Sequence, residues 1–256
     1  MYKIIFPEAN NEYIKEAASR LSEICEPVLV ESDLQDAAIK VLDGEVDAMI
    51  AGIDYPSRDV ILTTRDVIGV ASGKQTFSSL FVAKFQDGRR IILSDGATCK
   101  NPSAAQLADI IELAHDAAAK ILDEQPRVAI LSFSTFGSGG KDPSMDKTAE
   151  AISLIRNRRS DIIVDGEMQL DAAVNPRVGE KKAASRGGSE VAGHANVLIV
   201  PDINSGNILY KSLEQFAGAI VAGPILLGFA KPVSDLSRGS TVEDIILTAE
   251  SLIRLI

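Results

Sequence analysis

Residues 28–52 read VLVESDLQDAAIKVLDGEVDAMIAG, and this stretch decides the fold that we expect. Val28–Val30 and Ala48–Ala51 are short apolar runs of the kind that forms buried strands. Between them, Leu34–Leu42 spaces its apolar residues as one face of a helix does. Strand, helix and strand in this order predict a βαβ unit with parallel strands, which is the building block of an α/β protein.

The same alternation extends in both directions along the chain. Towards the N-terminus, Lys3–Phe6 predicts a strand and Glu12–Ile24 a helix with one apolar face. Beyond residue 122, strands and helices alternate again. The expected strands are Val128–Phe133, Asp161–Val164, Ala195–Val200 and Ile220–Leu227, and the expected helices are Pro143–Arg156, a short one from Met168, Ser205–Phe216 and Val242–Ile256.

One segment interrupts the parallel pattern. Phe77–Phe85 and Arg89–Leu93 are apolar runs on either side of Asp87-Gly88, a dipeptide that is typical of hairpin turns. A helix follows, with Thr98 or Asn101 as its expected N-cap. The hairpin therefore predicts an antiparallel ribbon and the start of a second subdomain.

Composition narrows the class of protein. The chain has 256 residues, of which 46% are hydrophobic and 24% charged, so a disordered or fibrous protein is excluded. The net charge of −10 repels nucleic-acid backbones, although a local basic pocket can still hold a small anion. Cys25 and Cys99 are too few for a disulfide scaffold, and no apolar run is long enough to cross a bilayer. We expect a cytoplasmic protein with no nucleic-acid or membrane partner.

A glycine-rich loop is the first candidate site. Ser132–Gly140 follows a predicted strand and leads into a helix that begins at Pro143. Small residues let backbone N–H groups approach an anion, and the helix start adds a favourable dipole. The loop is not a Walker A sequence, because Asp142 follows Lys141. The alternative interpretation is an ordinary strand-to-helix turn.

The second candidate is the segment Asp235–Asp244, which brings three kinds of chemistry into ten residues. Arg238 can hold a phosphate through two parallel hydrogen bonds. Ser237 can donate to an oxyanion, and Asp244 can accept a proton. The alternative is a surface helix capped by Ser240 or Thr241, on which the charged groups are only solvated.

The remaining candidates are single residues. In Pro201–Asn207, Asp202 or Asn207 could face a ligand at the carboxyl end of a strand, whereas Asn204 or Ser205 could instead be an N-cap. His115, His194 and the two cysteines have no neighbours at ligand spacing and no Cys–His pairing. We therefore predict no metal site and no cysteine nucleophile.

Three segments together resemble the phosphotransacylase family of phosphate acetyltransferases and phosphate butyryltransferases. They are Val128–Gly140, Val164–Ala173 and Val191–Asp244, and the likeness covers roughly residues 94 to 256 in unbroken order. The Asp235-Leu236-Ser237-Arg238-Gly239 block favours the acetyl branch.

The resemblance implies two α/β subdomains with mainly parallel sheets, a three-layer sandwich like that of phosphotransacetylases and isocitrate dehydrogenases, and a cleft between the two. We expect residues 1–70 with 229–256 to form one subdomain, to which the C-terminal helix returns, and residues 71–228 to form the other. It also implies a cytoplasmic homodimer that binds no cofactor, with coenzyme A, phosphate and acyl phosphate as substrates.

The resemblance further implies a role for each candidate residue. Asp244 corresponds to the proposed base for the coenzyme A thiol, Ser237 to the oxyanion donor and Arg238 to the cation that holds the anionic substrate. The loop residues Ser134, Thr135, Gly137 and Ser138 would cradle the phosphoryl group, with Asn207 nearby. Thiolate attack in a ternary complex needs no covalent enzyme intermediate.

One departure from the family pattern concerns an arginine. The family carries an Arg where this chain has Leu62. Arg58 and Arg65 lie four and three residues away, so on a helix either would reach the same face. We hypothesise that Arg58 or Arg65 supplies the missing charge.

Three alternatives remain open. A phosphobutyryltransferase-like enzyme would prefer longer acyl groups, and acyl-chain preference would reveal it. A non-catalytic homologue would bind coenzyme A or acyl phosphate without turnover. A nicotinamide dehydrogenase on a related fold is disfavoured, because no dinucleotide fingerprint follows an early strand.

Overall fold

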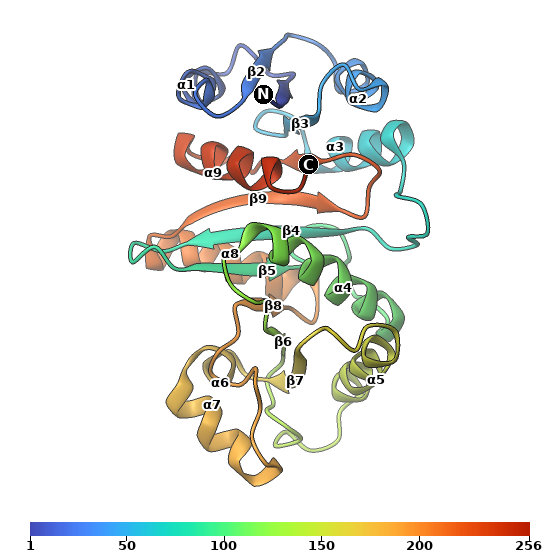
Figure 1. Cartoon of the computed structure of the whole chain (residues 1–256), viewed down its shortest axis with the longest axis vertical. Coiled ribbons are helices and arrows are strands. Elements are labelled where there is room, and N and C mark those ends of the chain that lie inside the picture. The colour runs from blue at the N-terminus through green and yellow to red at the C-terminus, as the bar shows by residue number, and fades with distance from the viewer. The chain divides into compact units, whose positions relative to one another are not determined.

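The computed structural model describes all of residues 1–256, and the chain divides into two compact units (Figure 1). Unit 1 comprises Met1–Asp87 and Leu213–Ile256, and unit 2 comprises Gly88–Ser212. The sequence placed the divisions after residues 70 and 228 instead. The strands β4 (Ser78–Lys84) and β9 (Ile220–Leu227) were expected in the second subdomain but belong to unit 1. They pair with each other, and β9 also pairs with a strand of unit 1.

The sheet of unit 1 has six strands. Its order is β2 (Glu26–Leu29), β1 (Lys3–Phe6), β3 (Ala48–Ala51), β10 (Val233–Asp235), β9 and β4. The first four strands are mutually parallel, whereas β9 runs antiparallel to both of its neighbours. The carboxyl ends of β1, β3 and β10 therefore meet at one edge of this sheet.

Helices cover this sheet because each carries one apolar face. Helix α1 (Glu12–Leu21) buries Ile14 and Leu21 and begins at the N-cap Asn11, and α2 (Leu34–Asp43) ends at Gly44 in the left-handed conformation. Helix α3 (Ser57–Thr63) continues into the π-helical turn η1 (Thr64–Ile68). Helix α9 (Val242–Ile253) packs on α1 and β9.

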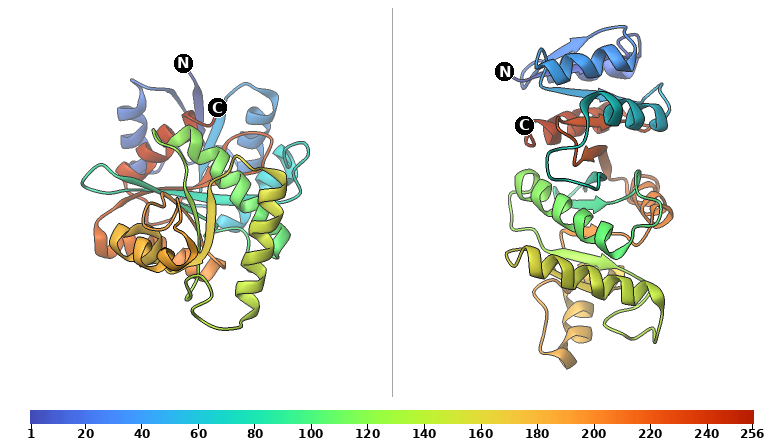
Figure 2. Two further views of the ribbon diagram at one scale, coloured as in Figure 1. Left: turned by 60° about the horizontal axis from the view of Figure 1, so that its bottom comes forward. Right: turned by 90° about the vertical axis from the view of Figure 1, so that its right-hand side faces the viewer.

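Unit 2 contains a fully parallel sheet. Its order is β5 (Arg90–Ser94), β8 (Val197–Ile199), β6 (Val128–Leu131) and β7 (Val164–Met168). Its helices are α4 (Ala104–Ile121), α5 (Pro143–Arg158), α6 (Leu170–Val174), α7 (Pro176–Ala183), the short η2 (Ala184–Arg186) and most of α8 (Ile203–Ala217). Figure 2 shows α4 and α5, in green and yellow-green, lying side by side.

The α/β class with mainly parallel strands, predicted from the sequence, is confirmed. The βαβ unit at residues 28–52 forms as β2, α2 and β3, and the two strands flanking Asp87-Gly88 form as β4 and β5. None of the helices combines the length and apolar character that a bilayer crossing requires.

Some element ends differ from the sequence expectations. Helix α4 is capped by Ser103, which forms a reciprocal capping box with Gln106, and not by Thr98 or Asn101. The Asp95 carboxylate explains this, because it accepts hydrogen bonds from the backbone N–H groups of Thr98 and Cys99 and so folds the preceding residues into a separate turn. Strand β7 begins at Val164, three residues after the expected start, and α9 is capped by Thr241 and not by Ser240.

Candidate functional site

The candidate residues of unit 2 gather at the carboxyl edge of its sheet. The loop 132–140 follows β6, Gln169 follows β7 and Pro201-Asp202 follows β8. Because these strands are parallel, the three segments meet at one edge, which is where open α/β sheets bind ligands. Asn207 lies on the first turns of α8, close behind this edge in sequence, with its side chain exposed.

The buried carboxylate of Glu167 organises the glycine-rich loop. Ser134 is 1% exposed, and its hydroxyl donates to Glu167 Oε1 at 2.8 Å. The Gly137 N–H donates to the same oxygen at 2.7 Å. Ser134 Oγ in turn accepts the Gly139 N–H at 2.8 Å. One oxygen of Glu167 therefore fixes both ends of the Ser134–Gly137 turn.

Every backbone N–H group from Ser134 to Gly140 already has an acceptor. The acceptors are the hydroxyls of residues 132, 134 and 138, the carbonyls of residues 135, 137 and 167, and the Glu167 carboxylate. The sequence analysis expected these N–H groups to donate hydrogen bonds to a bound phosphoryl group. In this structure, an anion at the loop would have to replace the Glu167 carboxylate or use the exposed Ser138 hydroxyl. The cradle of Ser134, Thr135, Gly137 and Ser138 stays a prediction.

Two further contacts tie the loop to its surroundings. Thr135 Oγ1 accepts the Gln169 N–H at 3.0 Å, which joins the ends of β6 and β7. The Arg186 guanidinium lies 4.1 Å from the centre of the Phe136 ring and donates to Asp165 Oδ1 at 3.1 Å. The loop is therefore held from both sides by groups that the sequence interpretation did not single out.

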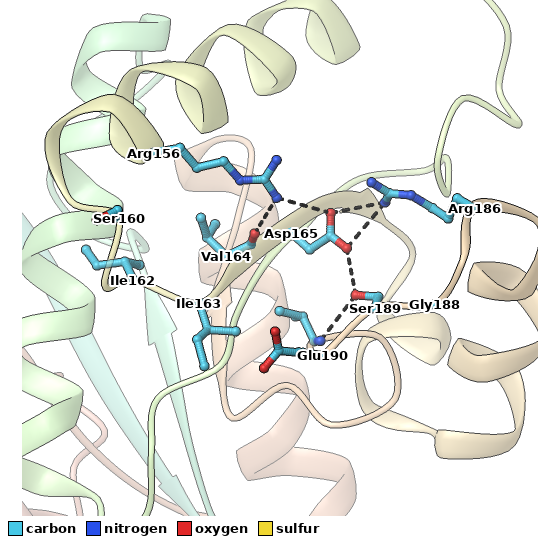
Figure 3. A pocket seen from close by; sticks show the side chains of 11 residues that line it. Arg156, Ser160, Ile162, Ile163, Val164, Asp165, Arg186, Gly188, Ser189 and Glu190 are labelled. Atoms are coloured by element: carbon cyan, nitrogen blue, oxygen red, sulfur yellow. Dashed lines mark hydrogen bonds and ion pairs between the residues drawn. The ribbon is translucent and has the colours of Figure 1, made fainter.

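A pocket of about 530 Å³ opens beside β7 in the same unit. Figure 3 shows Arg156 and Arg186 reaching toward Asp165 from opposite sides, with the Ser189 hydroxyl on its second oxygen. Isoleucine and valine side chains from residues 162–164 and Val191 complete the wall. None of the candidate residues named from the sequence lines this pocket. Both of its arginines face the Asp165 carboxylate, and Glu190 adds a second acidic residue to the lining, so the pocket offers no clear charge to a ligand.

The two cysteines are poor nucleophiles in this structure. Burial raises the pKa of the Cys25 thiol. Burial and the nearby Asp95 carboxylate raise the pKa of the Cys99 thiol, and the Lys147 ammonium only partly opposes this. A raised pKa lowers the thiolate fraction at neutral pH. No group of three or more histidine, cysteine and acidic side chains gathers as a metal site would require.

In unit 1, Ser237 and Arg238 lie on the loop between β10 and α9. Parallel pairing with β3 fixes the start of this loop, since the Leu236 N–H donates to the Ala51 carbonyl at 2.5 Å. The Ser240 N–H then donates to the Ser237 carbonyl at 2.9 Å and closes a turn. Ser237 is half-buried, and Arg238 is exposed without an ion pair or hydrogen bond. The Ser237 hydroxyl oxygen accepts the Gly239 N–H at 3.3 Å, which leaves its hydrogen free to donate. Both side chains are thus held on fixed backbone, and each has a donor that remains available.

Asp244 has a different environment from the one that a base would need. Its Oδ1 accepts the Val221 N–H of β9 at 2.9 Å. Its Oδ2 accepts both the N–H and the hydroxyl of Thr241 at 2.8 Å, in the capping box of α9. The side chain is 7% exposed. Asp244 therefore belongs to the helix cap and anchors a strand. The alternative interpretation expected the capped helix but also a solvated Asp244, and the buried, hydrogen-bonded carboxylate contradicts that second part.

The structure separates the two arginines near Leu62. Arg58 lies in α3, so it shares a helix face with Leu62 four residues later, and it is exposed and unpaired. Arg65 lies in the π-helical turn η1, where side-chain spacing changes, and it pairs with Asp66 at 2.8 Å. Of the two, Arg58 fits the hypothesised replacement better.

Sequence reasoning missed three buried acidic residues at these edges. Glu167 organises the unit 2 loop as described above. Glu8 follows β1 and accepts the backbone N–H groups of Gly52, Asp54 and Tyr55 at 2.7–2.9 Å. Asp235 ends β10 and is 0% exposed. Glu8 comes just after the apolar strand β1, and that position is a signal that could have found it. Glu167 and Asp235 lie within β7 and β10, whose sequences VDGEM and VSD are not apolar runs and give no such signal.

Comparison with known proteins identifies similar sequences over most of the chain. Residues 29–251 match the family model described as "Phosphate acetyl/butaryl transferase". A phosphate acetyltransferase from Treponema pallidum is 42% identical over 220 residues, which are 83% of this chain and 65% of that protein. One from Clostridium acetobutylicum is 40% identical over 85% of this chain and 66% of its own length. The chain thus spans about two thirds of the length of these curated relatives.

A solved structure agrees with the sequence matches. The phosphotransacetylase from Streptococcus pyogenes superposes with a TM-score of 0.87 at 30% identity, covering 99% of this chain and 93% of that one. The similarity therefore holds for the tertiary structure as well as for the sequence.

Proposed function

Because this chain belongs to the phosphate acetyl/butaryl transferase family, we propose that it interconverts acetyl-CoA plus phosphate with acetyl phosphate plus coenzyme A. The observation that carries the proposal is the loop at the end of β10. There, a half-buried hydroxyl on Ser237 and an unpaired guanidinium on Arg238 stand next to each other on backbone that β3 fixes. This pair can meet an anionic substrate and a developing oxyanion.

The proposed reaction balances without a covalent enzyme intermediate. The coenzyme A sulfur attacks the acetyl carbon, and the C–S bond forms as the C–O bond to phosphate breaks. The thiol proton leaves on a base, and phosphate departs with the electron pair of the broken bond. The Arg238 guanidinium offsets the phosphate charge, and the Ser237 hydroxyl donates to the carbonyl oxygen while it carries negative charge.

The base is the weakest part of the proposal inherited from the sequence. Asp244 accepts three hydrogen bonds and is almost fully buried, so it has little access to a thiol. We keep Asp244 as the base to be tested.

A pair of variants distinguishes a catalytic base from a residue that only caps the helix. Thr241→Ala removes the cap hydroxyl and keeps the Asp244 carboxylate, whereas Asp244→Asn removes the carboxylate charge and keeps the Thr241 hydroxyl. If Asp244 is the base, Asp244→Asn should lose far more kcat than Thr241→Ala when the two variants are equally stable. If Asp244 only caps the helix, both variants should show similar, small losses of kcat.

We further propose the identity of the second substrate, the absence of a bound cofactor, the location and the oligomeric state. Coenzyme A is a substrate, no bound cofactor takes part, and the protein acts in the cytoplasm as a homodimer. The supporting observations are the family membership and two free cysteines, one of them buried. In unit 2, the edge that carries Ser134, Thr135, Gly137, Ser138 and Asn207 would contribute to substrate binding.

The decisive experiment mixes the purified full chain with acetyl phosphate and coenzyme A and follows the thioester absorbance without added metal or nicotinamide. We expect acetyl-CoA to accumulate, and we expect added arsenate to lower its concentration by arsenolysis. Parallel reactions with butyryl phosphate test the chain-length alternative. Binding of coenzyme A in calorimetry with no turnover on any acyl phosphate would overturn the proposal and indicate a non-catalytic homologue.

A further inference from the structure

Asp235 is the one buried side chain whose polar atoms lack a partner. It is 0% exposed, and neither of its carboxylate oxygens accepts a hydrogen bond of normal geometry. Buried polar groups are almost always satisfied, and an orphaned one calls for an explanation. Asp235 also stands two residues before Ser237, at the start of the loop that carries the proposed chemistry.

The β3–α3 connection packs tightly against this carboxyl group. Gly52 has φ +109°, and a Cβ atom there would overlap Asp235 Oδ1 and the backbone of Leu236. The Gly52 N–H points instead to Glu8 Oε2 at 2.9 Å. Gly52 is therefore enclosed between two buried acidic side chains, one that accepts three N–H groups and one that accepts none.

No cation balances Asp235 from the elements that pack on it. The neighbouring strands β3 and β9 contain no titratable residue. On α3, Arg58 and Asp59 are exposed. On α9, Glu243 pairs with Arg20, Asp244 is held by the helix cap, and Glu250 is acidic. The nearest charged neighbour of consequence is Glu8, which is of the same sign.

We propose that Asp235 is a neutral carboxylic acid at the junction of β10 and the β3–α3 connection, and that its proton keeps the Ser237–Arg238 loop in place. Asp235 is then a positioning residue, since it acts through the loop and touches no substrate. An ionised carboxylate at this position would be repelled by Glu8 and would have only the Ser57 hydroxyl near it, with no hydrogen bond of normal geometry, so the end of β10 would have to move. The positioning role rests on the proposed function, whereas the neutral state does not.

Electrostatics agree with the geometry. Burial, together with the charge of Glu8, raises the pKa of Asp235 to about 7, although the Ser57 hydroxyl opposes the rise. A carboxyl whose pKa is higher in the folded than in the unfolded chain holds its proton more tightly when folded. Folding stability from this group is therefore complete below about pH 4 and is lost as the pH rises toward 7.

The test uses Asp235→Asn, which keeps the size of the side chain and cannot ionise, with the exposed Asp43→Asn as the matched control. Urea unfolding of the full chain is measured from pH 4.5 to 8. We expect the stability of the wild type and of Asp43→Asn to fall across this range relative to Asp235→Asn. Parallel curves for all three proteins would overturn the neutral-acid assignment. Carbon-13 NMR titration of the Asp235 carboxyl in the wild type decides the point if Asp235→Asn does not fold.

Kinetics test the positioning role. The ratio of kcat for Asp235→Asn to kcat for the wild type should rise about fivefold from pH 6 to pH 8.5, with the KM for acetyl phosphate within about twofold, because the ratio cancels the titration of coenzyme A itself. A flat ratio in an active enzyme would overturn the positioning role and leave the proposed function standing. A wild type without activity would overturn the proposed function, while the unfolding curves would still decide the state of Asp235.

Discussion

Glu167 in unit 2 and Asp235 in unit 1 are both buried acidic residues at the carboxyl end of a strand, yet their surroundings are opposite. Glu167 Oε1 accepts a hydroxyl and a backbone N–H at 2.7–2.8 Å. Asp235 accepts no hydrogen bond of normal geometry and lies against a glycine. Each stands next to a loop that carries predicted substrate contacts, so the molecule anchors these two candidate loops in two different ways.

The contrast shows what a buried carboxyl group can do for a loop. With donors, it offsets the cost of burial through hydrogen bonds and fixes the loop by direct attachment. Without donors, the free-energy cost of burying the carboxyl group is lowest when it is the neutral acid. The loop then depends on close packing and on the proton of that acid. We therefore expect the stability of unit 2 to fall when the Glu167 acceptor is removed. We expect the stability of unit 1 to depend on added side-chain volume next to Asp235 and on pH.

The largest expected effect tests the packing at Asp235. Gly52→Ala introduces a Cβ that overlaps Asp235 Oδ1 and backbone atoms, in a backbone conformation that disfavours alanine. We expect it to lower the free energy of unfolding by about 4 kcal/mol. Gly44→Ala is the matched control, because Gly44 also has positive φ and nothing lies near its Cβ position. It should cost only about 1 kcal/mol in urea unfolding. Equal losses in the two variants would show that Asp235 is not tightly enclosed.

Removal of Glu167 tests direct attachment. Glu167→Ala leaves the Ser134 hydroxyl and the Gly137 N–H without their acceptor, and we expect a loss of about 2–4 kcal/mol in urea unfolding. Glu167→Gln retains a carbonyl oxygen of nearly the same position and should recover more than half of this loss. If both variants unfold alike, the carboxylate charge rather than the acceptor geometry holds the loop.

Loss of Arg238 tests the catalytic side of unit 1. Arg238→Ala should lower kcat/KM roughly 30- to 150-fold, the usual effect of a charge-assisted hydrogen bond to an anionic substrate. Its stability should be nearly unchanged, since the guanidinium makes no hydrogen bond or ion pair within the chain and is exposed. The exposed Arg177 of α7 provides the control, and Arg177→Ala should be fully active. Similar rates for both variants would remove Arg238 from the site.

The smallest expected effect tests the hypothesis that Arg58 or Arg65 supplies the charge of the family arginine expected at Leu62. Arg58→Ala should raise the KM for acetyl phosphate about threefold to tenfold, and Arg65→Ala should change it less because Arg65 is paired with Asp66. Initial rates over a range of acetyl phosphate concentrations measure this. An unchanged KM in the double variant would exclude both arginines.

Much of the fold followed from the sequence because the alternation of apolar runs is local information. Ala48–Ala51 and Lys3–Phe6 were predicted with the ends that the structure shows, and α2 was predicted to within one residue. The β10 strand was missed, since its three residues form no recognisable run and only pairing with β3 and β9 makes them a strand. A helix in this region was considered only as the condition under which Arg58 or Arg65 would reach the same face as Leu62.

The candidate site divides in the same way. The sequence alone determined which residue types are present and that Ser237 and Arg238 stand on a loop before a helix, because capping and strand patterns are short-range. Only the tertiary structure decided that the Asp244 carboxylate accepts hydrogen bonds from Thr241 and Val221. It also decided that the loop N–H groups after β6 already donate within the chain, and that Asp235 accepts no hydrogen bond of normal geometry. Those outcomes depend on which donors distant segments bring within about 3 Å, and no local pattern contains that distance.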